Sequence, residues 1–112
     1  MQYMALIYTD PALTPEMGAS MNTEYFALNT RMKEAGVMMS GNALHPPTTA
    51  TSLRVRGGKT ETMDGPFAET KEHLGGYYLI DCANLDEALK WAAQIPGANF
   101  GTVEVRPVVV FG

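Results

Sequence analysis

The sequence predicts an α+β fold built around an antiparallel sheet. Three observations support this prediction. The apolar pattern changes along the chain between period two, which is typical of strands, and the helical period of 3.6 residues. Residues 52–56 and 59–63 alternate on either side of Gly57-Gly58, a pair that antiparallel hairpins use as a turn. The length of 112 residues without a composition break predicts one domain over residues 1–112.

The start of the chain predicts a strand and then a helix. Residues 2–8 (QYMALIY) are apolar or aromatic on both alternating faces, which indicates a central strand covered on two sides. Asp10-Pro11 ends this strand. Residues 14–16 (TPE) are typical of a helix start, and residues 21–35 carry apolar side chains at helical spacing. Gly36 is a typical C-terminal stop.

A second strand and a hairpin follow. Residues 37–44 (VMMSGNAL) predict the strand, and the prolines at 46 and 47 end it because neither can donate to a sheet. The hairpin around the glycine pair places Arg54 opposite Glu61. An exposed pair of opposite charge there supports the proposed register and adds a few tenths of a kcal/mol.

The last third of the chain repeats the strand and helix pattern. A charged loop over residues 64–75 leads into a predicted strand at 76–83. Asn84-Leu85-Asp86-Glu87 resembles a capping box, and an apolar stripe follows it until Pro96-Gly97. The stripe consists of Leu85, Ala88, Leu89, Ala92 and Ala93. Residues 102–106 alternate as a final strand.

Two helices among antiparallel strands fit the ferredoxin-like plan, in which both helices cover one face of the sheet. The other face must then accommodate the second apolar side of residues 2–8 and the apolar tail at 108–111 (VVVF). An exposed apolar patch of that size is unusual for a monomer. We therefore expect a two-fold homodimer in which two sheets pack face to face.

Charge and cysteine content exclude several functional classes. The formal charge is −4 and the basic residues are scattered, whereas nucleic-acid binding requires clustered Lys and Arg, so we expect no nucleic-acid partner. The single cysteine cannot form an internal disulfide, which favours a reducing compartment, the cytoplasm. The N-terminus has no basic leader and only a short apolar run, so we expect neither a signal peptide nor a membrane span.

The densest group of titratable residues is the loop at 64–73 (DGPFAETKEH). If this loop folds over an apolar pocket, Asp64 or Glu69 is a candidate general base, because burial raises the pKa of a carboxyl group toward neutral pH. Phe67 would supply part of the apolar wall. The alternative is that Asp64 binds the amides of its own turn and that Glu69, Lys71 and Glu72 lie in water, which is what we expect for Lys71 and Glu72.

Tyr8, His45 and Arg106 are candidate ligand contacts, together with Phe67. His45 stands where a strand ends, from which an imidazole can reach the mouth of a pocket and exchange a proton near neutral pH. Arg106, on the final strand, can bind the carboxylate of a ligand. The alternatives are a surface position for His45 and an ion pair across the sheet for Arg106.

Other kinds of chemistry lack their motifs. Cys82 alternates with Tyr78 and Ile80 on one strand face, which predicts a buried small side chain rather than a nucleophile. The acidic residues and His73 of the loop match no metal motif, and no glycine pair forms a phosphate loop before a helix. We therefore expect no metal and no cofactor.

Three segments resemble the DGPF group of YCII-related proteins: DGPFAETKE (64–72), GGYY (75–78) and VRP (105–107). The opening strand and EAGVMMSGNAL (34–44) are similar too, so the resemblance covers nearly the whole chain. It implies a bacterial, intracellular ferredoxin-like domain that dimerises through its sheets as a dimeric α+β barrel, with a pocket between sheet and helices. Most members of this group are uncharacterised, and some accompany sigma-factor genes.

The catalytic pair associated with the wider family is absent from this sequence. That pair is a histidine on the first helix and an aspartate before a late proline, whereas the helix TEYFALNTRMKEAG (23–36) has no histidine and the late position is Gln94-Ile95-Pro96. Two functional hypotheses remain. The chain is a small-molecule-binding protein with cofactor-free acid-base chemistry by Asp64 and Glu69, or it is a non-catalytic binding or regulatory dimer linked to transcription control.

Overall fold

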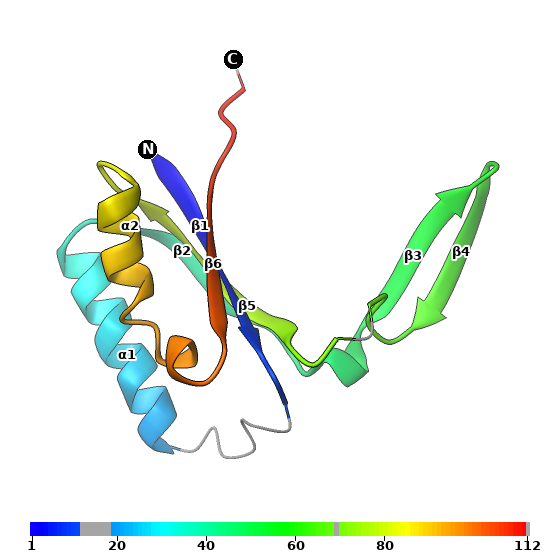
Figure 1. The fold of residues 1–112 in the computed structure, drawn as a ribbon, viewed down its shortest axis with the longest axis horizontal. Coiled ribbons are helices and arrows are strands. Elements are labelled where there is room, and N and C mark those ends of the chain that lie inside the picture. The colour runs from blue at the N-terminus through cyan, green and yellow to red at the C-terminus, as the bar shows by residue number, and fades with distance from the viewer. Residues whose placement is uncertain (12–18, 69, 112) are drawn as a thin grey trace.

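A computed structural model of the chain describes residues 1–11, 19–68 and 70–111. Within these ranges the chain forms a four-stranded antiparallel sheet and a separate two-stranded sheet (Figure 1). The elements are β1 (Gln2–Thr9), α1 (Ala19–Glu34), β2 (Met38–Ala43), β3 (Thr51–Arg56), β4 (Lys59–Asp64), β5 (His73–Asp81), α2 (Leu85–Ala92) and β6 (Thr102–Pro107), with short 3-10 helices η1 (Pro47–Thr49) and η2 (Pro96–Asn99).

The larger sheet has the strand order β2-β5-β1-β6. β1 lies between two antiparallel neighbours, with Ala5 opposite Tyr78 of β5 on one side and Val105 of β6 on the other. This confirms the central position predicted from the apolar run at residues 2–8, although only one of the two faces of β1 is buried in the single chain. The two helices lie together on one face of the sheet (Figure 1), so the α+β architecture is confirmed and is consistent with the ferredoxin-like plan.

The core lies between the helices and the covered face of this sheet. Alternate side chains of β1 and β5 point into it, because successive residues of a strand face opposite sides. Leu28 and Met32 of α1 lie one turn apart on the buried side of that helix and are fully buried. The other buried hydrophobic side chains in the described part of the chain are Tyr3, Ala5, Ile7, Val37, Tyr78, Ile80, Cys82, Ala88, Ala92 and Ile95.

The end of α1 follows the sequence prediction. Gly36 adopts a positive φ of 72°, and the Val37 amide donates to the Met32 carbonyl over 3.0 Å, which is the hydrogen bond of a Schellman C-cap. The predicted start at residues 14–16 lies outside the described residues. In the part of the chain that the structure describes, neither helix combines the length and the apolar character that crossing a membrane requires.

The start of α2 confirms the predicted cap at Asn84, although Glu87 reaches the amide before the cap residue rather than that of the cap residue itself, and the predicted apolar stripe of the helix is partly wrong. Asn84 Oδ1 accepts a hydrogen bond from the Glu87 amide (2.9 Å), and Glu87 Oε2 accepts one from the Ala83 amide (3.3 Å). Ala88 and Ala92 are buried, whereas Leu85 and Leu89 remain 46% and 47% exposed, and Ala93 is exposed as well. The helix packs through its smallest side chains, and the leucines lie roughly 20° to 100° around the axis from them, on the flank.

The hairpin at residues 51–64, here called the arm, extends away from the rest of the molecule (Figure 1). Gly57 and Gly58 have φ values of 57° and 76°, as the predicted two-residue turn requires. Arg54 lies opposite Glu61, as predicted, and its Nε lies 2.9 Å from Glu61 Oε2. The arm makes the molecule wider than a compact chain. The radius of gyration is 15.9 Å, whereas a compact chain of this length has a value of about 13 Å.

The second face of the larger sheet carries no helix among the described elements (Figure 1). We call it the open sheet face and define it by the partly exposed side chains of Met4, Leu6, Tyr8, Tyr77 and Leu79. The apolar tail is uncovered as well, since the residues from 109 to 111 are exposed. The surplus apolar surface predicted from the sequence therefore exists in the single chain.

Candidate functional site

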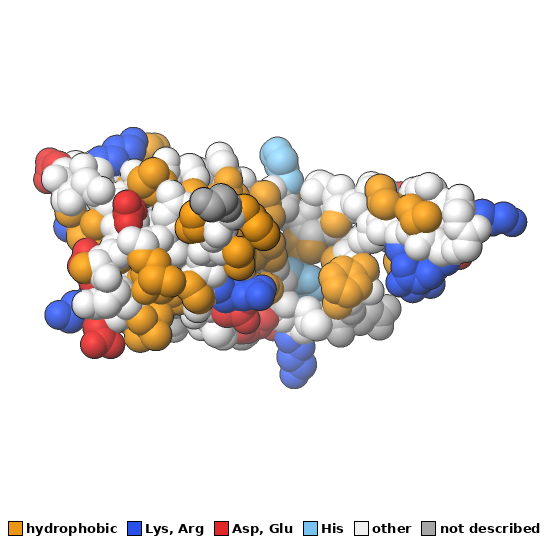
Figure 2. Space-filling model, turned by 90° about the horizontal axis from the view of Figure 1, so that it is seen from above, with side chains coloured by type: hydrophobic (Ala, Val, Ile, Leu, Met, Phe, Trp, Pro, Cys, Tyr) orange, Lys and Arg blue, Asp and Glu red, His pale blue; other side chains and the backbone are white. Residues whose placement is uncertain are grey.

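A groove with a volume of about 850 Å³ lies between the base of the arm and one end of the larger sheet. β1 and β6, the segment at 44–50 and the loop at 66–74 line it. Both histidines of the chain, His45 and His73, are among its lining residues. Figure 2 shows the histidine side chains at the narrow junction between the body and the arm. We call this feature the junction groove.

Three of the ligand contacts predicted from the sequence meet in the junction groove. They are Tyr8, His45 and Phe67, which come from β1, from the segment after β2 and from the loop after β4. Tyr8 is half-buried, His45 is exposed and Phe67 is 84% exposed. The fold thus brings together residues that are far apart in the sequence, although the prediction of their role in binding remains a prediction.

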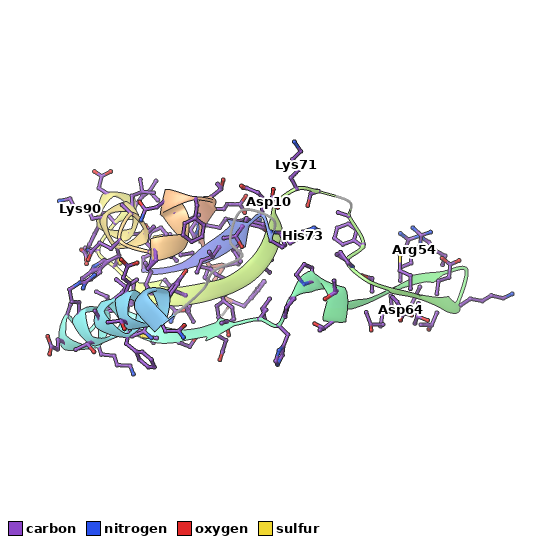
Figure 3. The ribbon with its side chains drawn as sticks, turned by 90° about the horizontal axis from the view of Figure 1, so that it is seen from below. Asp10, Arg54, Asp64, Lys71, His73 and Lys90 are labelled. Carbon is purple, nitrogen blue, oxygen red and sulfur yellow. The ribbon has the colours of Figure 1, made fainter. Side chains whose placement is uncertain are left out.

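The other predicted site residues lie elsewhere. Asp64 is exposed at the end of β4 and is absent from the described lining of the groove. Figure 3 shows it on the opposite face of the arm from Arg54. Arg106 lies two residues beyond Glu104 on β6, is exposed, and is likewise absent from that lining. Glu69 lies outside the described residues.

Hydrogen bonds to Gly65, rather than to the Asp64 side chain, hold the turn at residues 64–65. The alternative considered for Asp64 was an Asx-turn, but its carboxylate accepts no hydrogen bond from the described residues. Instead the Gly65 amide donates to the Ala50 carbonyl (2.6 Å), and Ser52 Oγ donates to the Gly65 carbonyl (2.8 Å). Gly65 has a φ of 95°, which favours glycine at this position. The loop therefore begins from a fixed point beside β3.

Glu72 was expected to lie in water, and this is only partly right. The residue is partly buried and lines the junction groove, and its carboxylate accepts a solvent-exposed hydrogen bond from Thr102 Oγ1, at 2.8 Å to Oε1. The backbone carbonyl of Glu72 accepts another hydrogen bond, from Thr70 Oγ1 (2.6 Å). β5 and β6 both run antiparallel to β1, so their first residues meet at the same end of the sheet. That topology, rather than local sequence, places Glu72 next to Thr102.

Apart from the Tyr8 phenol, the ionisable side chains in the described lining of the groove are carboxylates and imidazoles. Its lining contains two carboxylates, Glu72 and Glu104, two imidazoles, and no Lys or Arg among the described residues. Lys71 points away from the molecule (Figure 3). A cleft lined by carboxylates attracts cations and hydrogen-bond donors and disfavours anions. Histidine is the residue type that exchanges protons most readily near neutral pH, so the groove can serve acid-base chemistry.

A smaller cavity of about 240 Å³ lies on the other side of the sheet, between α1 and the β2–β5 edge. Its polar groups are uncharged. Tyr78 Oη donates to Asn29 Oδ1 (2.6 Å), and Tyr25 Oη accepts a hydrogen bond from the Gly97 amide (3.2 Å). Burial, and then the proximity of Tyr25, raise the pKa of Tyr78 to about 12, and burial raises the pKa of Tyr25. This cavity offers hydrogen bonds and no proton exchange near neutral pH.

Cys82 behaves as the sequence predicts. Its side chain is 3% exposed and belongs to the core cluster beside α2. Burial raises the pKa of the thiol, and the charges of Glu87 and Asp81 raise it further. The thiolate is the reactive form of cysteine, so a raised pKa and a buried position both disfavour a nucleophilic role.

No group of three or more His, Cys, Asp or Glu side chains is arranged to hold a metal ion within residues 1–11, 19–68 and 70–111. The absence of a metal and of a cofactor remains a prediction from the sequence.

Comparison with known proteins places the chain in a family. The model of the YCII-related domain matches residues 1–112. An uncharacterized protein from Rhizobium meliloti (strain 1021) is 43% identical over 117 aligned residues, which cover 99% of this chain and 94% of the relative. Both matches span the sheet, the arm and the junction groove. The chain belongs to the YCII-related domain family.

Proposed function

We propose that this protein binds a small organic molecule in the junction groove and exchanges protons with it without a cofactor. One observation carries the proposal. The chain has two histidines, from distant parts of the sequence, and both line the same groove together with Glu72 and Tyr8. Convergent polar groups in a partly apolar hollow are the usual features of a small-molecule site.

Each lining group has a role that follows from its chemistry. The imidazoles of His45 and His73 are the proton donor and acceptor. Glu72, held in place by Thr102, accepts a hydrogen bond or stabilises a positive charge on the ligand. Phe67 and Tyr8 provide aromatic surface. The described groove has two carboxylates and no Lys or Arg, so it favours a neutral or cationic ligand with an apolar part.

Asp64 is a weaker candidate for proton transfer than the histidines. It lies in solvent on the arm, outside the described groove lining, and a general base must lie within hydrogen-bond reach of the proton that it removes. Glu69 lies outside the described residues, so its role stays a prediction. Arg106 lies outside the described lining of the groove in its own chain. It can therefore contact the ligand, as predicted, only if a second chain brings it close to a groove.

The two histidines also provide the test. Their ring protons give two resolvable NMR signals, which the His45→Asn and His73→Asn variants assign. We expect that screening a library of small amines, neutral aromatics and carboxylic acids yields binders among the first two classes. Those binders should shift both ring signals. Binders that shift neither histidine signal, or only carboxylic acids as binders, would contradict the proposal.

Matched substitutions separate the groove from the arm. Tyr8→Phe and Glu72→Gln should weaken binding several-fold, because each removes one polar group from the groove. Asp64→Asn is the control and should leave the affinity unchanged, since that carboxylate lies outside the described lining. If Asp64→Asn abolishes binding while Glu72→Gln does not, the loop carboxylate rather than the groove carries the site.

A second candidate function is a non-catalytic binding or regulatory dimer linked to transcription control. The outward position of Asp64 and the uncovered apolar surfaces of the single chain favour it. In that case Asp64→Asn changes association and leaves ligand binding untouched. We also propose the finer assignment to the DGPF group, which the loop at 64–72 supports, and a cytoplasmic location, which the single cysteine supports.

A further inference from the structure

A hollow on the arm adjoins the junction groove. It has a volume of about 500 Å³, and residues of β3, of β4 and of the loop after β4 line it. We call it the arm hollow. Sites for small molecules usually have volumes of about 300 to 1,000 Å³ and combine apolar surface with a few polar groups. The arm hollow fits that description, because its lining combines two arginines with Met63 and Phe67.

The arm hollow differs from the junction groove in the sign of its charge. Its described lining holds Arg54 and Arg56 and one carboxylate, Glu61, whereas the described groove lining holds two carboxylates and no Lys or Arg. The two arginines are exposed and stand two positions apart on β3, so they lie on the same face of the arm. The arm hollow therefore attracts an anionic group, and the groove attracts a cationic one.

The two guanidinium groups have donors left for a ligand. Arg54 Nε donates to Glu61 Oε2 over 2.9 Å, and the terminal nitrogens of Arg54 make no hydrogen bond to the described residues. Arg56 uses one terminal nitrogen, which donates to the Val55 carbonyl over 3.1 Å. A guanidinium carries five N–H donors, so most of them remain unused on both side chains. Pairs of such donors are the usual partners of a carboxylate.

The two hollows share part of their walls. Ser52 and Phe67 line both of them, so the arm hollow and the junction groove are continuous past these residues. Phe67 is 84% exposed, which leaves most of it open to contact with a ligand. In Figure 2 a hydrophobic group lies between a histidine and the basic side chains of the arm, the order that the two linings predict. One molecule can therefore reach both hollows past a single aromatic side chain.

We infer that the ligand of the junction groove carries opposite charges at its two ends, a protonated amine at one and a carboxylate at the other, with an aromatic part between them. The amine lies in the groove beside Glu72 and Glu104. The aromatic part lies against Phe67, and the carboxylate binds Arg54 and Arg56 in the arm hollow. This inference rests on the proposed function, because it names the class of ligand for the same groove.

The test uses matched probes and follows the ring signals of the two histidines during NMR titration of the full chain. The probes are phenethylamine, its para-carboxy and para-carboxyethyl derivatives, and para-ethylbenzoate, which has the carboxylate without the amine. We expect at least one of the two zwitterions to have a dissociation constant about tenfold below that of phenethylamine, because the added carboxylate gains charged hydrogen bonds in the arm hollow. Para-ethylbenzoate should bind more weakly than that zwitterion.

Substitutions on the arm assign the gain to the arm hollow. Arg54→Gln with Arg56→Gln should reduce the ratio between the dissociation constants of phenethylamine and the zwitterion to about two or less. Glu61→Gln should increase that ratio, because it removes the carboxylate that competes with the ligand for Arg54. Lys59→Gln is the control. It removes a positive charge from the same arm outside the described lining of the hollow, so the ratio should stay unchanged.

The outcomes separate this inference from the proposed function. If phenethylamine shifts the histidine signals and neither zwitterion binds more tightly, the inference is overturned and the proposed function stands. The inference also fails if Lys59→Gln reduces the ratio as much as the arginine substitutions do, or if para-ethylbenzoate binds as tightly as the zwitterions. If none of the probes that carry an amine shifts a histidine signal, the proposed function fails as well.

Discussion

At the scale of single residues, the most informative side chain is the Tyr78 phenol. It is buried against α1, donates to Asn29 over 2.6 Å, and has a pKa raised to about 12 from an ordinary value of 10.0, first by burial and then by Tyr25. The folded protein therefore retains this proton at a pH where the unfolded chain has released it. Because the folded state favours the neutral phenol, this group stabilises the fold at neutral pH, and that stabilisation is lost in alkali.

We predict that the free energy of unfolding falls as the pH rises from 10 to 12, because only the unfolded chain ionises Tyr78 in that window. The expected loss is about 1 to 2 kcal/mol, less than the full shift implies because water partly screens the group. Urea unfolding at stepped pH measures it. Tyr78→Phe should flatten the slope, with a remainder from Tyr25. An unchanged slope in that variant would contradict the assignment.

The close packing around Gly101 leads to a second prediction at this scale. A Cβ atom there would collide with the Tyr8 carbonyl oxygen and lie 3.0 Å from Thr9 Cγ2. Gly101→Ala should therefore lower the free energy of unfolding by about 1 to 3 kcal/mol and displace Tyr8 in the junction groove. Gly75→Ala is the control, since its nearest atom would lie at 3.5 Å. Equal stability of the two variants in urea titration would count against this packing.

The sequence predicted which residues line the groove better than it predicted which residues contact each other there. Tyr8, His45 and Phe67 were identified by residue type and position, and the fold brings them into one groove. Glu72 was assigned to solvent because its partner Thr102 lies 30 positions away, on a strand whose place in the sheet no local pattern shows. Asp64 was favoured for its motif, although its exposure depends on how the arm leaves the body.

At the scale of elements, local signals were reliable wherever the element is held by its own residues. The hairpin turn, the Gly36 stop and the Asn84 cap all have the predicted geometry, because each depends on backbone conformation within a few residues. The apolar stripe of α2 was less reliable. Periodicity showed that one side of the helix is apolar, but not which part of that side faces the sheet.

The Asn84 cap allows a direct measurement. Asn84→Ala should lower the free energy of unfolding by about 1 kcal/mol, because the Glu87 amide then loses its acceptor at the first turn of α2. Asp86→Asn is the matched control at the same turn. It removes only a favourable charge near the helix N-terminus, for a loss of about 0.3 kcal/mol. Thermal unfolding of both variants distinguishes the cap from the charge, and equal losses would argue against the cap.

At the scale of the whole molecule, the sequence predicted too much apolar surface for one chain, and the structure shows where it lies. The prediction concerned the sheet and the tail. It did not include the arm, because alternation identifies a hairpin and gives no information on whether that hairpin joins the main sheet. Long-range strand order is set by packing across the core, so the separation of β3 and β4 from the other strands became visible only in three dimensions.

The arm holds three basic and two acidic residues, whereas the rest of the chain holds five basic and ten acidic ones, and this asymmetry gives a prediction about salt. If copies pair through the arm, Arg56→Gln with Lys59→Gln should weaken association at about 0.05 M NaCl, because the basic tip loses its attraction for an acidic body. At about 0.5 M NaCl the variant and the wild type should associate equally, since screening removes the difference. Sedimentation at both salt concentrations tests this. A variant that matches the wild type at low salt would leave the contact purely apolar.

Cys82 has a practical consequence, because it is the single thiol of the sequence and lies within the core. A cysteine introduced at the arm tip, for example by Lys59→Cys, would be the only thiol open to reagents in the native state. Spin labels or fluorophores could then be attached at one defined point without first removing the natural cysteine. The chain thus already has the chemical selectivity needed to measure how far one arm tip lies from another.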